Sequence, residues 1–119
     1  MAKSVLVVDD EQGYRDMYVY LLEPFGAEVT CVENGCQAWE KIQTRAYDLI
    51  LMDVHMPGMD GYEVFKKTKA LRPQQKIAIF SSSSDPNHDR ERKALKEGAV
   101  ECLFKPMDIS QIEKIMENL

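Results

Sequence analysis

The feature that most constrains the fold is the stretch from Leu49 to Gly61. Four consecutive apolar residues, Leu49 to Met52, run directly into Asp53, and a loop rich in proline and glycine follows. An apolar run of this length between turn residues predicts a strand that is buried on both faces. Open α/β sheets carry their chemistry at the carboxyl ends of such strands. We therefore expect Asp53 to be a nucleophile that accepts a phosphoryl group.

Short apolar runs alternate with segments of helical periodicity along the whole chain. Five strands are predicted, at residues 5–8, 27–32, 49–52, 77–80 and 100–104, and a helical pattern follows each of them. This alternation predicts a single α/β domain with a parallel sheet covered by helices on both faces. Right-handed crossovers place all the carboxyl ends of the strands along one edge. The polar residues at those ends are Asp9, Asp10, Asp53, Ser81 and Lys105.

The helices have predictable ends and buried faces. Asn34-Gly35 indicates a turn or a helix cap. Helix starts are indicated by Asp85 before Pro86 and by two capping-box patterns, Asp60 with Glu63 and Asp108 with Gln111. Gly26 and Gly98 mark helix ends. The fourth helix is mostly charged, with Ala94 and Leu95 as its apolar residues, and is expected to be marginal and exposed. The residues expected on the buried faces of the other helices are Met17, Leu21 and Leu22 (with Tyr14, Tyr18 and Phe25), Ala38, Trp39, Ile42, Ala46, Tyr62, Phe65 and Leu71 (with Val64 and Thr68), Ile109, Ile112, Ile115 (or Met116) and Leu119.

The composition argues against several classes of protein. A chain of 119 residues suits one domain, and a net charge of -5 argues against direct nucleic-acid binding. The three cysteines and two histidines have neither a disulfide nor a zinc spacing, and the cysteines are expected to be inert, buried or half-buried residues. No signal peptide precedes the first strand, and no apolar run is long enough to span a bilayer. We expect a reduced, cytoplasmic protein without membrane insertion.

Three carboxylates, those of Asp9, Asp10 and Asp53, are expected to meet at one site. Like charges this close raise at least one pKa unless a cation is present, and hard divalent cations prefer oxygen ligands. A Mg²⁺ (or Mn²⁺) site is therefore expected at this edge of the sheet. The alternative is that Asp9 or Asp10 only caps the following helix.

Three other residues lie where they can take part in this chemistry. Lys105 can pair with Asp53, or with a phosphoryl group that replaces the pair, and the alternative is a solvated lysine. Ser81 can donate to a phosphoryl oxygen, or it leads the next helix within a run of four serines. His55 is either a loop residue at the mouth of the site or a proton shuttle. No glycine-rich phosphate loop supports nucleotide binding.

Together these residues resemble a response-regulator receiver domain of two-component signalling. The resemblance covers essentially all 119 residues. It rests on residues 7–11 (VVDDE), residues 53–61 (DVHMPGMDG), Ser81 after the strand at 77–80, and Gly98-Ala99 followed by Lys105-Pro106. It implies a flavodoxin-like, doubly wound fold with a five-stranded parallel sheet in the order 2-1-3-4-5.

The resemblance also implies a role for each site residue. Asp53 would be the phosphoacceptor, and Asp10, Asp53 and the backbone carbonyl of His55 would ligate Mg²⁺, with Asp9 bound through water. Lys105 would bind the acyl phosphate, and Ser81 would turn its hydroxyl toward it. The peptide bond before Pro106 would be cis, although cis is the rarer geometry for such bonds. A histidine kinase or a histidine phosphotransfer protein would supply the phosphate, and a downstream protein would read the fourth helix, fifth strand and fifth helix.

One position departs from the family pattern. Receiver domains usually carry Tyr, Phe or His three residues before the strand-end lysine, where the ring rotates on activation, and here that residue is Cys102. Phe104 lies on the same side of the strand but two residues further on, so it is no direct substitute. The usual coupling between the serine, here Ser81, and an aromatic ring is therefore in question, because the ring position is occupied by Cys102. The smaller residue leaves room for a partner's side chain, or for a switch through loop and backbone movement alone.

Three other functions compete with a phosphorylated switch. The first is an interaction module that works without phosphate. The second is an aspartyl-phosphate phosphatase of the haloacid-dehalogenase kind, which would need an acid where His55 stands and a cap domain as well. The third is FMN binding, which lacks its Ser/Thr-rich loop after the first strand. The chain resembles a stand-alone receiver of the chemotaxis or phosphorelay kind, and equally a receiver cut from a longer protein.

Overall fold

The computed structural model describes residues 2–54, 56, 61–82, 89–105 and 108–119. Its five strands form one all-parallel sheet in the order β2-β1-β3-β4-β5, which confirms the predicted doubly wound topology. The strands are β1 (Ser4–Val8), β2 (Glu28–Val32), β3 (Leu49–Asp53), β4 (Ile77–Ser82) and β5 (Glu101–Lys105). The helices are α1 (Gln12–Leu22), the short 3₁₀ helix η1 (Glu23–Phe25), α2 (Gly35–Thr44), α3 (Gly61–Leu71), α4 (Asp89–Lys96) and α5 (Ile109–Glu117).

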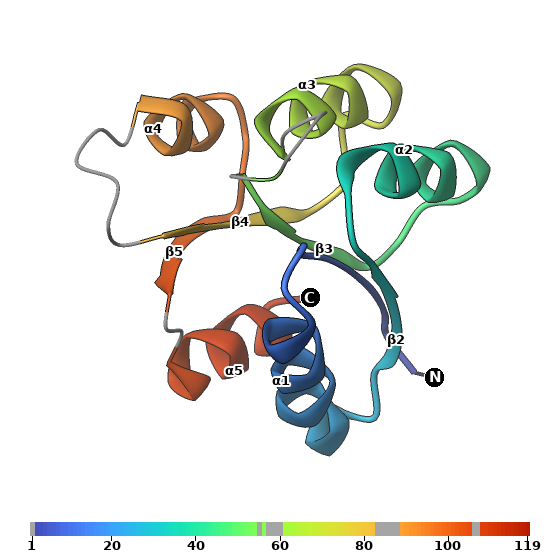
Figure 1. Ribbon diagram of the computed structural model, residues 1–119, viewed down its shortest axis with the longest axis vertical. Coiled ribbons are helices and arrows are strands. Elements are labelled where there is room, and N and C mark those ends of the chain that lie inside the picture. Colours follow the sequence, from blue (N-terminus) through green and yellow to red (C-terminus); the bar gives the residue numbers. More distant parts are fainter. Residues whose placement is uncertain (1, 55, 57–60, 83–88, 106–107) are drawn as a thin grey trace.

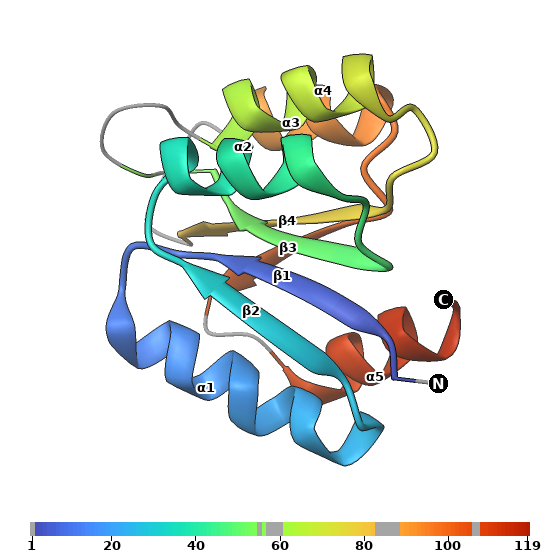
Figure 2. The same cartoon turned by 90° about the vertical axis from the view of Figure 1, so that its right-hand side faces the viewer.

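The helices cover the sheet in two layers. α2, α3 and α4 lie on one face, and α1 and α5 lie on the other (Figures 1 and 2). Successive strand side chains point to opposite faces. Ile50 and Ile79 therefore enter the core beneath α2–α4, whereas Leu51 and Phe80 enter the core beneath α1 and α5. Every residue of β3 is buried, as the sequence predicted for the central strand.

Local signals set the ends of several helices. Asn34 caps α2 by accepting a hydrogen bond of 2.8 Å from the backbone N–H of Gln37. Asp108 and Gln111 form the predicted capping box of α5. Gly26 ends η1 in the left-handed region, with φ of 66°, which favours glycine. The predicted caps at Asp60 and Asp85 lie outside the described residues.

Some predicted burial was wrong. Met17, Leu71 and Ile109 are 37%, 49% and 46% exposed. Leu71 and Ile109 are the terminal residues of their helices. In α1 the buried residues Tyr18 and Leu22 are four apart and define the buried face, so Met17 points outward. Periodicity alone does not show where a helix leaves the sheet.

The cysteines and α4 also depart from expectation. Cys31 and Cys36 are exposed, because β2 is an edge strand and Cys36 lies in the first turn of α2. The charged helix α4 is not wholly exposed, since it buries Glu91 as well as Ala94. Among the described residues, no helix is long and apolar enough to cross a membrane.

Candidate functional site

Three charged side chains gather at one end of the sheet because of strand alternation. Asp53 and Lys105 end β3 and β5, two residues beyond Leu51 and Leu103, which are buried beneath α1 and α5. Alternation therefore turns Asp53 and Lys105 to the same side. Asp9 follows β1 and is completely buried there. Side chains from three strand ends thus converge on the α1–α5 side.

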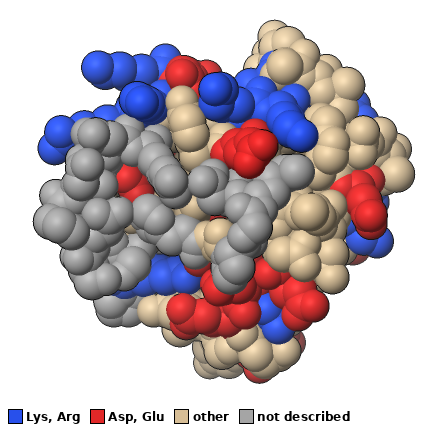
Figure 3. Space-filling model, turned by 45° about the horizontal axis from the view of Figure 1, so that its top comes forward, with Lys and Arg blue, Asp and Glu red and all other residues tan. Residues whose placement is uncertain are grey.

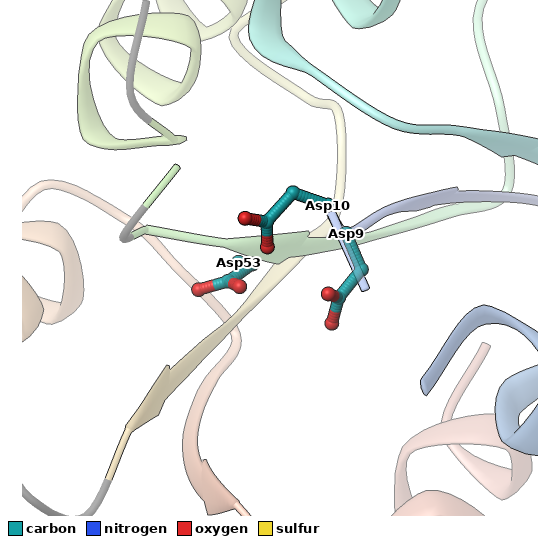
Figure 4. Close-up of side chains that lie close together, drawn as sticks. All are labelled: Asp9, Asp10 and Asp53. Carbon is teal, nitrogen blue, oxygen red and sulfur yellow. The ribbon is translucent and has the colours of Figure 1, made fainter. Parts of the chain in front are cut away.

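The carboxylates of Asp9, Asp10 and Asp53 form the acidic cluster that the sequence predicted. One oxygen of each lies within 4.8 Å of the others, and Figure 4 shows the three side chains next to one another at the ends of β1 and β3. Asp53 is only 4% exposed, whereas Asp10 is exposed to solvent. The cluster is therefore mostly buried but open on the side of Asp10.

Lys105 supplies the positive charge at the cluster. Its Nζ lies 2.9 Å from Oδ2 of Asp9 and 3.0 Å from Oδ2 of Asp53. Burial alone would lower the pKa of Lys105, but its hydrogen bonds to Asp9 and Asp53 and the negative charges of these carboxylates together outweigh burial and raise that pKa above the ordinary value. The alternative of a solvated lysine is wrong, because this side chain is only 8% exposed.

The charge balance of the cluster fits a divalent cation. Three ionised carboxylates and one ammonium leave a formal charge of -2 (1 minus 3). All three carboxylates offer hard oxygen ligands of the kind that Mg²⁺ prefers, and the exposed side at Asp10 gives access to water and phosphate oxygens. The residues present therefore suit Mg²⁺ as a resident ion.

Helix α1 contributes two tyrosines that sequence reasoning placed only on an apolar helix face. The Tyr18 hydroxyl lies 3.5 Å from Oδ2 of Asp9, and burial together with the charges of Asp9 and Asp53 raises the pKa of Tyr18. The ring centroid of Tyr14 lies 4.1 Å from Nζ of Lys105, which is a cation–π distance. Asp9 also accepts a hydrogen bond of 2.9 Å from the N–H of Glu11. The N-cap of α1 is Glu11, so Asp9 is not the cap of that helix, and its contacts to Lys105 and Tyr18 make it part of the charged site.

Gly61, the first residue of α3, lies directly against the backbone of Asp53 and Val54. Its N–H donates to the carbonyl oxygen of Val54 at 3.2 Å. A Cβ atom at Gly61 would overlap the backbone carbonyl of Asp53. Only glycine allows α3 to begin this close to the strand that carries Asp53. The sequence contained this glycine next to a predicted cap, but nothing in its spacing showed the close approach.

Ser81 lies at the same end of the sheet but faces the other layer. It is two residues beyond Ile79, so alternation turns it toward the α2–α4 side. Its hydroxyl donates a hydrogen bond of 2.6 Å to Oε1 of Glu91 in α4. Glu91 is only 2% exposed, yet the sequence marked α4 as a solvated charged helix. No pattern distinguished Glu91 from the charged residues around it.

Cys102 and Phe104 share the α4 side of β5, as strand alternation predicted. Cys102 is half-buried and Phe104 is 42% exposed, whereas Leu103 and Lys105, which point to the opposite face, are buried. Burial, followed by the negative charges of Glu91 and Glu101, raises the pKa of Cys102 to about 11. His55 and Pro106, which the resemblance assigned to the metal site and to a cis peptide, lie outside the described residues.

Comparison with known proteins agrees with this geometry. The chain matches the family model described as the response regulator receiver domain over residues 5–117. It is 36% identical over 115 residues to the transcriptional regulatory protein ZraR of Escherichia coli O157:H7, covering 97% of this chain and 26% of ZraR. It is also 36% identical over 118 residues to the sensor protein GacS of Pseudomonas syringae pv. syringae, covering 97% of this chain and 13% of GacS.

A solved structure of similar length has the same fold. The chemotaxis protein CheY4 of Vibrio cholerae is 28% identical with a TM-score of 0.85, and the match covers 99% of this chain and 98% of that protein. By contrast, the chain spans about a quarter of the length of the curated regulators that it matches. The family model matches nearly the whole chain, and the protein therefore belongs to the response-regulator receiver domain family.

Proposed function

We propose that the protein is a phosphoacceptor switch in which Asp53 receives a phosphoryl group from a phosphohistidine. The observation that carries this proposal is the position of the Asp53 carboxylate. It ends the central strand, shares a cluster with Asp9 and Asp10, and lies 3.0 Å from the ammonium of Lys105. A carboxylate beside a cation and a metal site is arranged for attack on phosphorus.

The transfer exchanges one bond at phosphorus for another. A carboxylate oxygen of Asp53 attacks the phosphorus, a P–O bond forms, and the P–N bond to the donor imidazole breaks with its electron pair remaining on nitrogen. Asp10, Asp53 and the carbonyl of His55 would hold Mg²⁺, with Asp9 acting through water, and the ion would neutralise charge on the transferred group. Lys105 would move its hydrogen bond from Asp53 to a phosphoryl oxygen.

The donor would be a sensor histidine kinase or a histidine phosphotransfer protein, encountered in the cytoplasm. Residues 1–119 would act as one receiver domain and pass the signal to a downstream protein through the surface of α4, β5 and α5. The same site would later admit water to the acyl phosphate, so the protein would assist its own dephosphorylation. It would thus act as a phosphoacceptor rather than as an enzyme with a separate substrate.

The proposal is tested with acetyl phosphate and Mg²⁺, followed by intact-mass spectrometry. Wild type should gain one phosphoryl group, about 80 Da, and chelation of the metal should prevent the gain. Asp53→Asn should gain nothing. Asp16→Asn, which changes an exposed aspartate of α1, should behave as wild type. Equal labelling of wild type and Asp53→Asn would overturn the proposal and favour an interaction module that works without phosphate.

A further inference from the structure

A buried hydrogen bond joins α4 to the strand beside Asp53. The Ser81 hydroxyl donates to Oε1 of Glu91 over 2.6 Å, and both residues are buried, with Ser81 at 0% and Glu91 at 2% exposure. A hydrogen bond from a hydroxyl to a carboxylate is charge-assisted and short, as this one is. Glu91 thus lies inside the layer beneath α4 although the exposed residues of that helix are mainly charged.

The position that usually carries the switch ring faces the same space. Cys102 lies on the α4 side of β5 and pairs with Ile79 of β4, two residues before Ser81. It therefore lies on the same face of the sheet as the Ser81 side chain that Glu91 contacts. A cysteine occupies much less volume than Tyr, Phe or His. The Glu91 carboxylate therefore lies over the same face of the β4–β5 pair on which a receiver domain usually has a ring.

We propose that Glu91 replaces the usual aromatic ring as the residue that couples phosphorylation of Asp53 to the position of α4. In the unphosphorylated protein, Glu91 positions Ser81 by accepting a hydrogen bond from its hydroxyl group. After phosphorylation, Ser81 donates to a phosphoryl oxygen instead, and the Glu91 carboxylate turns toward water and displaces α4. This inference rests on the proposed function of Asp53.

The exchange follows from the single proton of a hydroxyl group. Ser81 can donate one hydrogen bond, so a bond to a phosphoryl oxygen removes the donor from Glu91. A buried carboxylate that loses a donor loses stabilisation that water can restore. Ala94 is buried and Tyr62 of α3 donates to Glu97 just after α4, so these anchors lie C-terminal to Glu91. Movement is therefore expected at the end of α4 that carries Glu91.

Cys102 provides a reporter for this movement. Cys31 and Cys36 are exposed and are replaced by serine, so that Cys102 is the remaining thiol. The protein is treated with acetyl phosphate and Mg²⁺ until part of it is phosphorylated, and a maleimide is added in a short pulse. Intact-mass spectrometry then shows, for each species, whether it carries the phosphoryl group, the maleimide label or both. The rate of labelling of Cys102 is thus compared between phosphorylated and unphosphorylated protein in one tube.

The phosphorylated species should be labelled about five- to tenfold faster, because displacement of α4 uncovers the thiol and removes the nearby charge of Glu91. In Glu91→Ala the ratio of the two rates should fall to about one, since no carboxylate remains to be displaced. Glu91→Gln, which keeps an acceptor without the charge, should give a ratio between these values. Glu40→Gln is the matched control on an exposed glutamate of α2, away from α4, and should keep the wild-type ratio.

The lifetime of the phosphoryl group is a second measurement, and it distinguishes a positioning role of Glu91 from a purely structural one. Without Glu91, Ser81 is released from its bond before phosphorylation, so Glu91→Ala should hold its phosphoryl group about three- to tenfold longer than wild type. A folded wild type that gains the phosphoryl mass with an unchanged labelling rate would overturn the inference and leave the proposed function standing. The same holds if Glu91→Ala keeps the wild-type ratio. Failure of the wild type to gain phosphoryl mass would overturn the proposed function and this inference with it.

Discussion

Gly61 is the residue whose replacement should disturb the site most directly without altering its chemistry. Its missing side chain allows the start of α3 to lie against the backbone of Asp53 and Val54. In Gly61→Ala the added methyl group must push β3 and α3 apart, which should lower the free energy of unfolding by about 3 kcal/mol, the upper end for overpacking. Urea unfolding measures this change, and phosphorylation by acetyl phosphate should slow as well.

Gly13→Ala is the matched control for this substitution. Gly13 lies in α1, and a Cβ atom there meets nothing within 4 Å. Alanine favours the helix, so this variant should be stabilised by about 0.5 kcal/mol. Equal effects of the two substitutions would show that the close approach at Gly61 has no influence on stability.

Lys105 and a divalent cation should compete for the same carboxylates. In metal-free protein, Lys105→Met leaves Asp9 and Asp53 without their shared ammonium, which should lower the free energy of unfolding by about 3 kcal/mol. Added Mg²⁺ neutralises the same charges. It should therefore raise the melting temperature of Lys105→Met more than that of wild type, and should bind the variant more tightly.

Thermal melting across a magnesium titration measures both effects of Lys105→Met. Lys93→Met, which removes an exposed lysine from α4, should respond to Mg²⁺ as wild type does. If the Lys105 and Lys93 variants gain the same stability from magnesium, the ion and the ammonium do not share ligands.

At the scale of elements, strands were more predictable than helix faces. The apolar runs before Asp9 and Asp53 could be recognised because a strand buried on both faces tolerates few polar residues. Exposure of Leu71 could not be predicted, since it depends on the direction in which α3 leaves the sheet. The N-terminal ends of α2 and α5 could be predicted because Asn34 and Asp108 satisfy backbone groups locally. The C-terminal end of α2 was not predicted, since Ala46, expected on its buried face, lies beyond Thr44 and is exposed.

The candidate site was predictable to the extent that it follows from strand ends. The convergence of Asp9, Asp10, Asp53 and Lys105 requires only the parallel topology. The Ser81–Glu91 hydrogen bond could not be predicted, because it joins two elements whose spacing and rotation depend on packing. A charged residue in a charged helix gives no sign in the sequence that it is buried.

The cap of α2 provides a test at the scale of one element. Asn34→Ala removes the acceptor for the backbone N–H of Gln37 and should lower the free energy of unfolding by about 1 kcal/mol. Asn34→Asp keeps the acceptor and adds a negative charge at a helix N-terminus, so it should be as stable as wild type or more stable. Urea unfolding measures both variants, and equal losses in the two would show that the side-chain acceptor is not what stabilises this end of α2.

At the scale of the whole molecule, acidic and basic side chains gather at different places on one face. On the face shown in Figure 3, Asp and Glu side chains gather below the centre, and many Lys and Arg side chains lie at the upper left. Such a separation orients an approaching partner that carries charges of its own.

Alkaline pH should destabilise the whole fold through groups that hold their protons more tightly when folded. The pKa of Cys102 rises from 9.0 to about 11 through burial and then the charges of Glu91 and Glu101. Burial also raises the pKa of Tyr18. The pKa of Lys105 is raised despite burial, because Lys105 forms hydrogen bonds with two negatively charged carboxylates. In each case the folded state binds more protons than the unfolded state above the ordinary pKa, so stability falls as pH rises.

The fall should therefore begin near pH 9 with Cys102 and continue above pH 10 with Tyr18 and Lys105. Free energies of unfolding from urea titrations at pH 8 to 11 measure it, in a background where Cys31 and Cys36 are serine. Adding Cys102→Ser should flatten the curve between pH 9 and 11, since a serine hydroxyl does not ionise there. Tyr18→Phe should leave the slope between pH 9 and 10 unchanged and reduce it above pH 10. If Cys102→Ser has the same slope as its parent, the thiol titrates alike in the folded and unfolded chains, and the negative charges beneath α4 do not reach it.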